Sequence, residues 1–421
     1  MPRSAVWTPD VIKEIREKSK TGKYINRGFG ANRPLPSLDD LMVVPAQLYG
    51  PAAVDRYREE VKTRVVIGER LLKPLVLETP VFIPAMSFGA ISKAGKMAFA
   101  LGAAKAGTAT NTGEGGALPE EREVTRSEGQ GKLIVQWSTG RFGVDVDYLR
   151  MADAIEIKIG QGAKPGMGGH LLAEKVSPAI AEIRKIPVGT DALSPCRHLD
   201  TDSPEDLRLH VELLREATDY QIPIILKLGP GRVYEDVKLA VECGVDAVAI
   251  DGGEGGTGCA PEVASEHAGI PTLGLFGPAM RAFKETRARE RGIKLMVMGG
   301  IRNGADVYKC LALGADAVGM ATATMIAAGC IGCQECHTGT CKQGLATQAA
   351  DAAMDWRDAG QKLANFLKVT TEELKTLVAL SGHDNIDQLS PDDLVALDIN
   401  AAAMTGVKLI GYDRPLPWWR E

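Results

Sequence analysis

The sequence predicts an α/β protein built on a (β/α)8 TIM-type barrel, with an N-terminal cap and a helical C-terminal tail. Eight short apolar runs recur between residues 76 and 345, and each is followed by glycines and then by a stretch with helical periodicity. Strands that alternate with helices are typical of parallel architecture, and eight such units suggest a closed barrel. A barrel takes about 250 residues, which leaves room for flanking segments in a chain of 421.

The predicted strands share an apolar, often β-branched composition and occupy residues 81–86, 107–111, 133–137, 154–159, 222–227, 246–250, 295–298 and 316–319. Two further runs, 188–193 and 272–276, are also compatible with strands. Because these runs make the strand count ambiguous, a doubly wound open sheet is the alternative.

The flanks divide the chain into three expected regions. Residues 1–75 are charged and helical in pattern, with a glycine-rich interruption at Gly28-Phe29-Gly30, and we interpret them as a cap or an interface arm. The barrel is expected over 76–345. Residues 346–421 are expected to be helical, because apolar side chains recur at helical spacing over 363–377. Within this segment Ser390 is the expected N-cap of a helix that begins at Pro391.

Composition excludes several classes of partner. Hydrophobic residues make up 45% of the chain and charged residues 24%, which predicts a large buried core. The net charge of −5 provides no basic field for nucleic acid or an anionic membrane. No segment reaches the roughly 20 apolar residues that a bilayer crossing needs, and the first residues lack the apolar core of a signal peptide. We therefore expect a cytoplasmic protein.

Glycines at the ends of the last strands indicate a phosphate-bearing ligand. The seventh strand ends in Gly299-Gly300, and the eighth ends at Gly319, two residues before Ala321. Glycines here let backbone N–H groups approach a phosphate, and the following helix adds its positive end. The sixth strand runs into a loop that contains Gly255-Gly256-Thr257, which suits a flat ring or a phosphate. The alternatives are tight turns and a mobile surface loop.

Polar side chains at the other strand ends indicate an acidic or redox-active ligand. Ser87 follows the first strand, Glu114 follows the second, and Lys158, Gln161 and Lys164 follow the fourth. Glu114 can act as an acid or base, while the lysines suit a dicarboxylate or a reduced flavin. Lys227, within the fifth strand, could likewise stabilise an anionic reduced flavin. Each lysine alone could instead be a surface residue whose charge reaches solvent.

Four of the eight cysteines fall within residues 330–341, with the spacing C-x2-C-x2-C-x4-C. They are Cys330, Cys333, Cys336 and Cys341. In a reducing compartment such a run indicates metal binding rather than disulfides, and its tight spacing favours an iron–sulfur cluster. A structural zinc is the second interpretation, and reduced structural thiols are the third.

Taken together, these motifs resemble a known family. Residues 87–92, 111–116, 158–169, 255–258 and 299–302 are similar, in this order, to the FMN-binding synthase domain of glutamate synthase, in its stand-alone large-subunit form. The resemblance implies an oxidoreductase that binds FMN and an iron–sulfur cluster. It also implies that 2-iminoglutarate, formed from 2-oxoglutarate and ammonia, is reduced to L-glutamate with electrons entering through the cluster.

The resemblance also assigns roles by position. Expected FMN contacts are Ser87, Gln136, Lys227, Gly255, Gly256, Thr257, Gly299, Gly300, Gly319 and Ala321. The residues expected in catalysis are Glu114, Gln161 and Lys164, and those expected to bind substrate are Lys158, Lys164, His170 and Arg184. Cys330, Cys336 and Cys341 match the three cluster ligands of the family.

The chain departs from the family pattern in three ways. Cys333 is an additional thiol, so the cluster is expected to be 3Fe–4S or 4Fe–4S. Met167 and His170 stand where the family has Glu and Gln, which leaves the amine and keto acid open. Pro2 follows Met1, so the N-terminal cysteine that hydrolyses glutamine is missing. We therefore expect separate glutaminase and electron-donor subunits in a homo- or hetero-oligomer.

Three alternatives remain at this stage. The first alternative is the large subunit of an N-methylglutamate synthase, which uses methylamine. The tail, from residues 364–369 to 401–404, resembles stand-alone large subunits that include this enzyme. A flavin and iron–sulfur subunit that only transfers electrons within a larger complex is the second. A barrel that binds another phosphorylated ligand and a zinc is the third.

Overall fold

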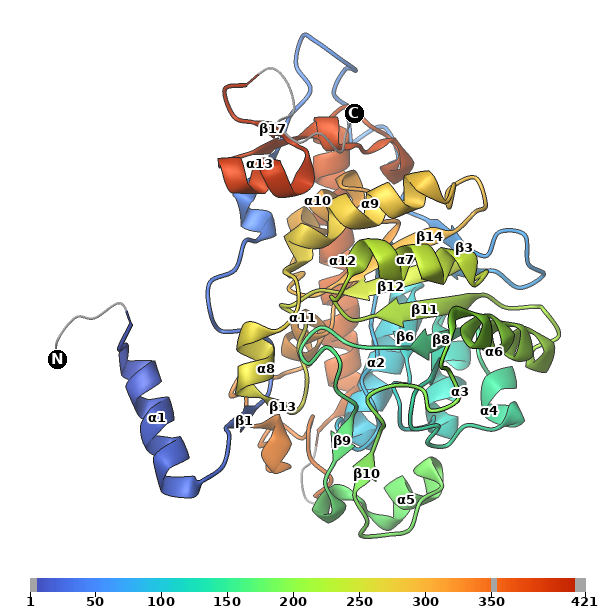
Figure 1. The fold of residues 1–421 in the computed structure, drawn as a ribbon. Helices are drawn as coiled ribbons and strands as arrows, with labels where there is room; N and C mark the ends of the chain where they lie inside the picture. Colours follow the sequence, from blue (N-terminus) through green and yellow to red (C-terminus); the bar gives the residue numbers. More distant parts are fainter. Residues whose placement is uncertain (1–5, 350–353, 413–421) are drawn as a thin grey trace.

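The computed structural model describes residues 6–349 and 354–412, and its centre is a barrel of eight parallel strands (Figure 1). The barrel strands are β5 (Val81–Phe82), β6 (Ala109–Asn111), β7 (Lys132–Trp137), β8 (Ala154–Lys158), β11 (Ile224–Leu228), β12 (Ala247–Asp251), β14 (Lys294–Met298) and β15 (Ala317–Gly319). All eight predicted strands are confirmed, although several are shorter than expected.

The sheet closes between its first two strands. β5 pairs with β15 on one side, and on the other side Ile83 forms a parallel bridge to Thr110. The amide of Ile83 donates to the carbonyl of Ala109 at 2.8 Å. The open-sheet alternative is therefore wrong, and all eight strands present their carboxyl ends at one rim.

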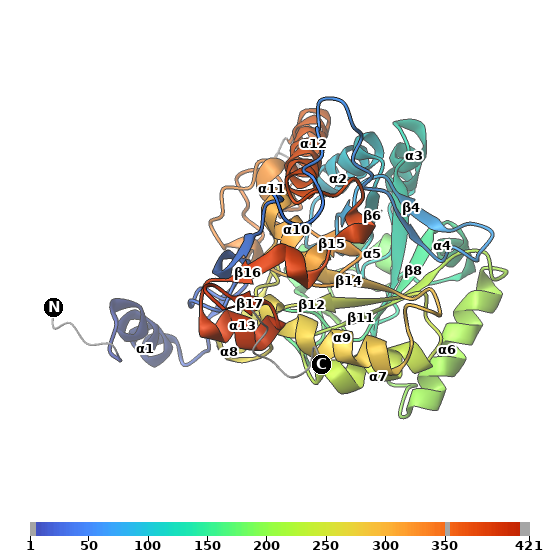
Figure 2. The same cartoon turned by 90° about the horizontal axis from the view of Figure 1, so that it is seen from above.

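Helices cover the outside of the barrel, and amphipathic ones such as α7 (Val233–Glu242) bury one apolar face towards the strands (Figure 2). They include α2 (Lys93–Ala106), α3 (Pro119–Ser127), α4 (Val146–Arg150), α6 (Pro204–Ala217), α7, α9 (Phe276–Glu285), α10 (Gly304–Ala312) and α11 (Thr322–Ala327). Local sequence fixes where they begin: α6 starts at Pro204 after the capping box of Ser203 and Asp206. Within the described ranges, no helix is both long and apolar enough to span a bilayer.

Two insertions lie at the carboxyl rim. β9 (His170–Leu171) and β10 (Ala192–Leu193) form an antiparallel pair that encloses α5 (Pro178–Arg184). β13 (Ala260–Pro261) and α8 (Glu262–His267) follow β12. The run 188–193 therefore contributes a two-residue strand outside the barrel, and 272–276 forms a 3-10 turn (Thr272–Leu275) that leads into α9.

The prediction of a helical N-terminal region is wrong for most of its length. Of the described residues before 76, only α1 (Pro9–Thr21) forms an α-helix, and it stands away from the body of the molecule (Figure 1). The remainder consists of loops and turns, a 3-10 turn (Leu38–Asp40) and the short strands β1 (Asn26–Arg27), β2 (Leu41–Val43), β3 (Val65–Ile67) and β4 (Leu75–Leu77). Prolines at 34, 36, 45 and 51 remove backbone donors and prevent longer helices there.

The tail is helical only in part. α12 (Trp356–Leu380) contains the predicted apolar stripe and packs along α2, where Gly102 and Gly360 allow a close approach. Ser390 is an N-cap as predicted, but of a 3-10 turn (Pro391–Asp393). β16 (Leu394–Ala396), α13 (Ile399–Thr405) and β17 (Lys408–Leu409) follow. β16 pairs with both β17 and β2, so segments from both ends of the chain share one sheet.

The α2–α12 contact yields a stability prediction. Leu363 is fully buried, and its side chain lies 2.6 Å from where a Cβ on Gly102 would be. Leu363→Ala should lower the free energy of unfolding by about 2–5 kcal/mol, because it leaves a cavity at a tight crossing. Urea denaturation followed by circular dichroism measures this. The matched control Lys362→Ala, on the exposed side of α12, should change it by less than about 0.5 kcal/mol.

Candidate functional site

A cavity of about 650 Å³ opens at the carboxyl rim of the barrel, where all eight strands end. Every barrel strand or the loop directly after it contributes to its wall. The lining also includes residues 26 and 29–32 of the N-terminal segment, Gln334, Cys336 and His337 of the cysteine-rich segment, and Phe366 of α12. Segments distant in sequence therefore meet at one site, and the barrel rim is the place where ligands of this fold bind.

Most of the residues singled out from the sequence line this cavity. They are Ser87, Glu114, Gln136, Lys158, Gln161, Lys164, His170, Lys227, Gly255, Gly256, Thr257, Gly299, Gly300, Gly319, Ala321 and Cys336. Four others are not part of its wall: Arg184, Cys330, Cys333 and Cys341. Arg184 is buried behind the wall, where its guanidinium donates to the carbonyl of Phe88 at 2.8 Å.

The ends of β14 and β15 form the part of the wall where the sequence predicts a bound phosphate. Gly299 and Gly300 have φ of 112° and 72°, a conformation that favours glycine. A Cβ on Gly299 would lie 2.9 Å from the amide nitrogen of Gly252. The backbone is thus packed closely at the end of β14, where glycines let a phosphate approach the main chain. The amides of Gly304, Ala305 and Asp306 at the start of α10 are already hydrogen bonded to Glu373 and Asn303.

An acidic group and two lysines form the opposite corner. The Glu114 carboxylate accepts from the Lys158 ammonium at 3.1 Å and from the Ser194 hydroxyl at 3.0 Å. Burial alone would raise the pKa of Glu114, but Lys158 and Arg184 lower it below its ordinary value. Glu114 is therefore ionised at neutral pH and holds its acceptor oxygens at the cavity wall.

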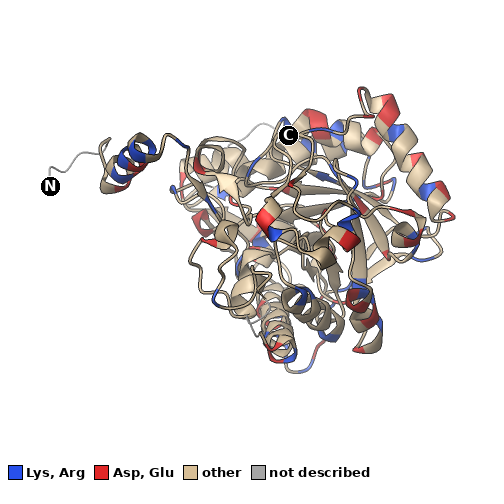
Figure 3. Ribbon diagram, turned by 90° about the horizontal axis from the view of Figure 1, so that it is seen from below, with Lys and Arg blue, Asp and Glu red and all other residues tan. Residues whose placement is uncertain are grey.

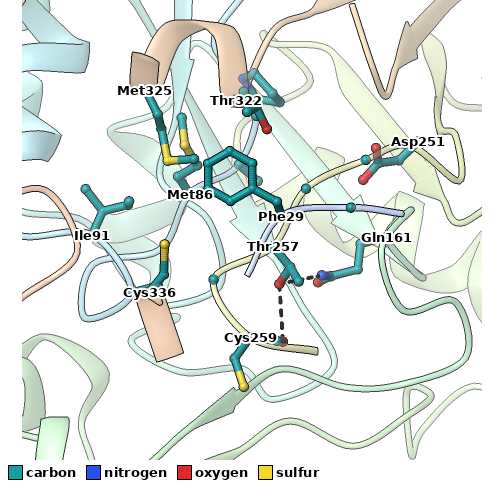
Figure 4. A pocket seen from close by; sticks show the side chains of 18 of the residues that line it. Phe29, Met86, Ile91, Gln161, Asp251, Thr257, Cys259, Thr322, Met325 and Cys336 are labelled. Carbon is teal, nitrogen blue, oxygen red and sulfur yellow. Dashed lines mark hydrogen bonds between the residues drawn. The ribbon is translucent and has the colours of Figure 1, made fainter. Parts of the chain in front are cut away.

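Lys164 is the less compensated cation of this corner. Its ammonium donates to the carbonyl of Cys259 at 2.9 Å. Burial, followed by the charge of nearby Lys158, lowers the pKa of Lys164. Gln161 lies beside it and reaches Thr257 of the glycine-rich loop (residues 252–258) at 3.4 Å (Figure 4). An anionic ligand would relieve the repulsion between the two lysines.

Buried charges inside the barrel support the floor of the cavity. Burial alone would lower the pKa of Lys227, but Asp251, 3.5 Å away, and Glu156 raise it. Glu156 is fully buried and accepts from Gln136 at 2.6 Å and from Asn111 at 3.0 Å. Sequence reasoning missed Glu156 and Asp251, although a charged residue within an apolar strand signals such a role.

His198 is another residue that sequence reasoning missed. Its ring stacks on Trp137, with centroids 4.8 Å apart, and its Nδ1 lies 2.6 Å from the Arg141 guanidinium. Because arginine can only donate, Nδ1 must accept, so Nε2 carries the hydrogen that it donates to the Lys158 carbonyl at 2.8 Å. His198 thus fixes the backbone at the end of β8.

The cysteine loop (residues 330–341) lies beside the cavity. Cys333 is exposed, whereas Cys330, Cys336 and Cys341 are partly buried. Burial raises the pKa of the Cys336 thiol to about 11, and the other three cysteines of the loop add to this rise. The four thiols are therefore electrostatically close. Within residues 6–349 and 354–412, no three metal-binding side chains are placed to hold a single ion. A polynuclear cluster spreads its thiolates further apart than one ion does.

Comparison with known proteins identifies the family. The conserved region of glutamate synthase matches residues 47–384. The chain belongs to the glutamate synthase family. This member is 41% identical to a glutamate synthase large subunit-like protein of Rhizobium meliloti, over 97% of this chain and 95% of that one. It is 39% identical to an archaeal-type glutamate synthase (NADPH) of Thermotoga neapolitana, over 98% and 83% respectively.

This glutamate synthase family member is accordingly an oxidoreductase. Its barrel is also similar to that of a flavocytochrome b2 variant with sulfite bound. That likeness has a TM-score of 0.56 over 89% of this chain and 81% of the other. The identity is 17%, so it supports the fold alone.

His198 yields a pH prediction. Burial and the neighbouring Arg141 lower the pKa of His198 from 6.5 to about 4. As the pH drops, His198 is protonated in the unfolded chain before it is protonated in the folded protein. The free energy of unfolding therefore falls between about pH 6.5 and about pH 4. Between pH 7 and pH 5, the free energy of unfolding of the wild-type protein should fall by about 1–2 kcal/mol more than that of His198→Gln, as measured by urea denaturation. His267→Gln, at an exposed histidine, should behave as wild type. If the free energy of unfolding fell equally in His198→Gln and in the wild type, the lowered pKa of His198 would be contradicted.

Proposed function

We propose that the chain is an FMN- and iron–sulfur-dependent subunit that reduces 2-iminoglutarate to L-glutamate. The observation that carries this proposal is the arrangement of one cavity. Close-packed glycine backbone lies on one side of it, and the Glu114, Lys158 and Lys164 corner lies on the other. The first suits a phosphate and a flat ring, and the second suits a dicarboxylate that undergoes proton transfer.

The cavity wall fits FMN in its chemistry. The backbone of Gly299, Gly300, Gly319 and Ala321 would hold the phosphate. Ser87, Gln136, Lys227 and the glycine-rich loop, through Gly255, Gly256 and Thr257, would surround the ring. The raised pKa of Lys227 keeps it cationic, which favours an anionic reduced ring. FMN, when bound, supplies the hydride for reduction of a C=N bond.

The other corner would bind the keto acid and its imine. Lys158 and Lys164 would hold its carboxylates, with Gln161 and the half-exposed His170 at the edge. Glu114, ionised beside Lys158, would accept and return the proton that imine formation and reduction require. Arg184 would act from behind the wall, because it helps to keep Glu114 ionised.

Electrons would enter through a cluster on the cysteine loop. Cys330, Cys336 and Cys341 would be its ligands, with Cys333 as the fourth in a 4Fe–4S cluster. Cys336 contributes to the cavity wall, so a cluster held there would lie next to the flavin site. Residues 76–345 would form this catalytic unit. Separate subunits would supply electrons and ammonia, as "large subunit-like" in the name of the Rhizobium meliloti protein also suggests.

The central test is synthesis of glutamate. Anaerobic protein with bound FMN, chemically reduced and given 2-oxoglutarate and ammonium, should form L-glutamate detectable by mass spectrometry. Glu114→Gln should slow this by at least about 100-fold, because the proton carrier is lost. Glu123→Gln, an exposed glutamate on α3, should not.

Two outcomes would redirect this proposal. Product with methylamine but not with ammonium would favour N-methylglutamate synthase, to which Met167 and His170 would then contribute. A flavin spectrum that does not change on addition of 2-oxoglutarate would favour a subunit that only transfers electrons.

The cluster has its own test, by EPR spectroscopy and iron analysis of anaerobic, oxidised protein. A 3Fe–4S cluster is paramagnetic in this state, and Cys333→Ser should leave its signal unchanged. A 4Fe–4S cluster is silent, and Cys333→Ser should then reduce the iron content and create a signal. Cys341→Ser should deplete iron in both cases, whereas Cys196→Ser, at an exposed cysteine outside the loop, should not. Colourless protein that contains zinc would contradict the iron–sulfur assignment.

A further inference from the structure

Residues 26–33, here called the strap, cross the rim between α1 and the barrel (Figure 1). β1 of the strap pairs antiparallel with β13, with Asn26 opposite Pro261 and Arg27 opposite Ala260. The strap is therefore joined by backbone pairing to the segment that follows the glycine-rich loop.

Charged groups hold both ends of the strap on α8. The buried Arg27 forms an ion pair with Glu266, and Glu262 lies 3.6 Å from it. The Glu266 carboxylate also accepts from the amides of Asn32 at 2.8 Å and Arg33 at 3.1 Å. Since one carboxylate receives groups from both ends, the strap is held in a bent form.

The middle of the strap touches two functional loops at once. The amide of Gly28 donates to the carbonyl of Gln334 in the cysteine loop at 2.8 Å. The next amide, that of Phe29, donates to the carbonyl of Thr257 in the glycine-rich loop at 2.9 Å. Gln334 also donates from its side chain to Asn32 at 3.1 Å. Adjacent strap residues thus connect the expected cluster site with the expected flavin site.

Steric contact explains the two glycines of the strap. A Cβ on Gly28 would lie 3.1 Å from the Gln334 carbonyl oxygen and 3.4 Å from the Cys336 sulfur. A Cβ on Gly30 would lie 2.5 Å from the carbonyl oxygen of Glu254. The main chain of Gly28 and Gly30 therefore packs directly against both loops, and a larger residue at either position would displace a loop.

Phe29, between these glycines, has a φ of 67°, which is uncommon for a bulky residue. Its ring points into the cavity towards Met86 and Met325 (Figure 4). Strained backbone of this kind clusters at functional sites.

We infer that the strap is a positioning element that holds the cysteine loop against the glycine-rich loop and seats Phe29 as an apolar wall of the cavity. This wall keeps water and dioxygen away from the flavin that the cavity would bind. The second role rests on the proposed function, since it requires a bound flavin, whereas the first does not.

The positioning role is tested by thiol reactivity in metal-free protein. Native protein is treated with iodoacetamide, and alkylation of each cysteine is followed by mass spectrometry. In Gly28→Val the displaced loop should expose Cys336, and its alkylation rate should rise about fivefold or more over wild type. The exposed Cys196 serves as internal reference and should not change.

Two further variants complete this test. Arg27→Met releases the strap without a steric clash and should also raise Cys336 reactivity, so a folding failure of Gly28→Val leaves the test intact. Tyr24→Ala, an exposed aromatic next to the strap that is not part of the cavity wall, should match wild type. Cys336 reactivity at the wild-type level in both folded strap variants would overturn the positioning role.

The wall role is tested with FMN-loaded protein. The anionic reduced flavin would give two electrons and one proton to dioxygen, and solvent would supply the second proton, which yields oxidised flavin and hydrogen peroxide. After anaerobic reduction and mixing with aerated buffer, Phe29→Ala should form peroxide about fivefold faster than wild type, and Phe29→Leu should restore most of the protection. Equal rates in wild type and Phe29→Ala would overturn the wall role. If wild type binds no FMN, the proposed function fails, while the alkylation result still decides the positioning role.

Discussion

Closure of the sheet between β5 and β6 is the constraint on which the site depends. Only a few backbone contacts join these strands, through Ile83. At the carboxyl end of this seam, the buried Lys96 of α2 donates to the carbonyls of Met86 and Asn111, both at 2.9 Å. Its charge is balanced by the buried Glu121 of α3, 2.9 Å away. Lys96 is thus hydrogen bonded to the segment that follows β5 and to the last residue of β6. Ser87 comes directly after the first of these contacts and Glu114 shortly after the second, and both line the cavity.

Burial of charge recurs around the cavity, and most of the buried charges have a polar or charged partner, whereas Lys164 donates only to a backbone carbonyl. Lys227 faces Asp251, Glu114 faces Lys158, and Glu156 receives two amide groups. A buried charge without a partner would destabilise the fold by several kcal/mol. Paired charges are tolerated, and they provide fixed dipoles that surround a ligand without reorganisation. These pairs place charged groups in a cavity whose lining also contains many apolar side chains. On the outer surface, some helices carry charged residues of both signs, as α6 does (Figure 3).

Regions outside the barrel contribute to the same rim. The N-terminal strap and the cysteine loop lie about 300 residues apart in sequence, yet Gly28 and Gln334 are hydrogen bonded. β2 and β16, from opposite ends of the chain, pair in a small sheet on the outside. Long-range contacts of this kind cannot be inferred from local periodicity, which is why the role of residues 26–33 went unpredicted and the N-terminal region was wrongly expected to be helical.

The sequence by itself determined the eight strands, the position of the site at their carboxyl ends and many of the polar residues and glycines that line it, because parallel strands and glycine turns leave local signals. It also showed the cysteine run, whose spacing is a local property. Only the tertiary structure decided that the sheet closes, that Phe29 lines the cavity, and that Arg184, His198 and Glu156 support its wall from behind. These depend on which distant segments meet, and the packing of the whole chain decides that.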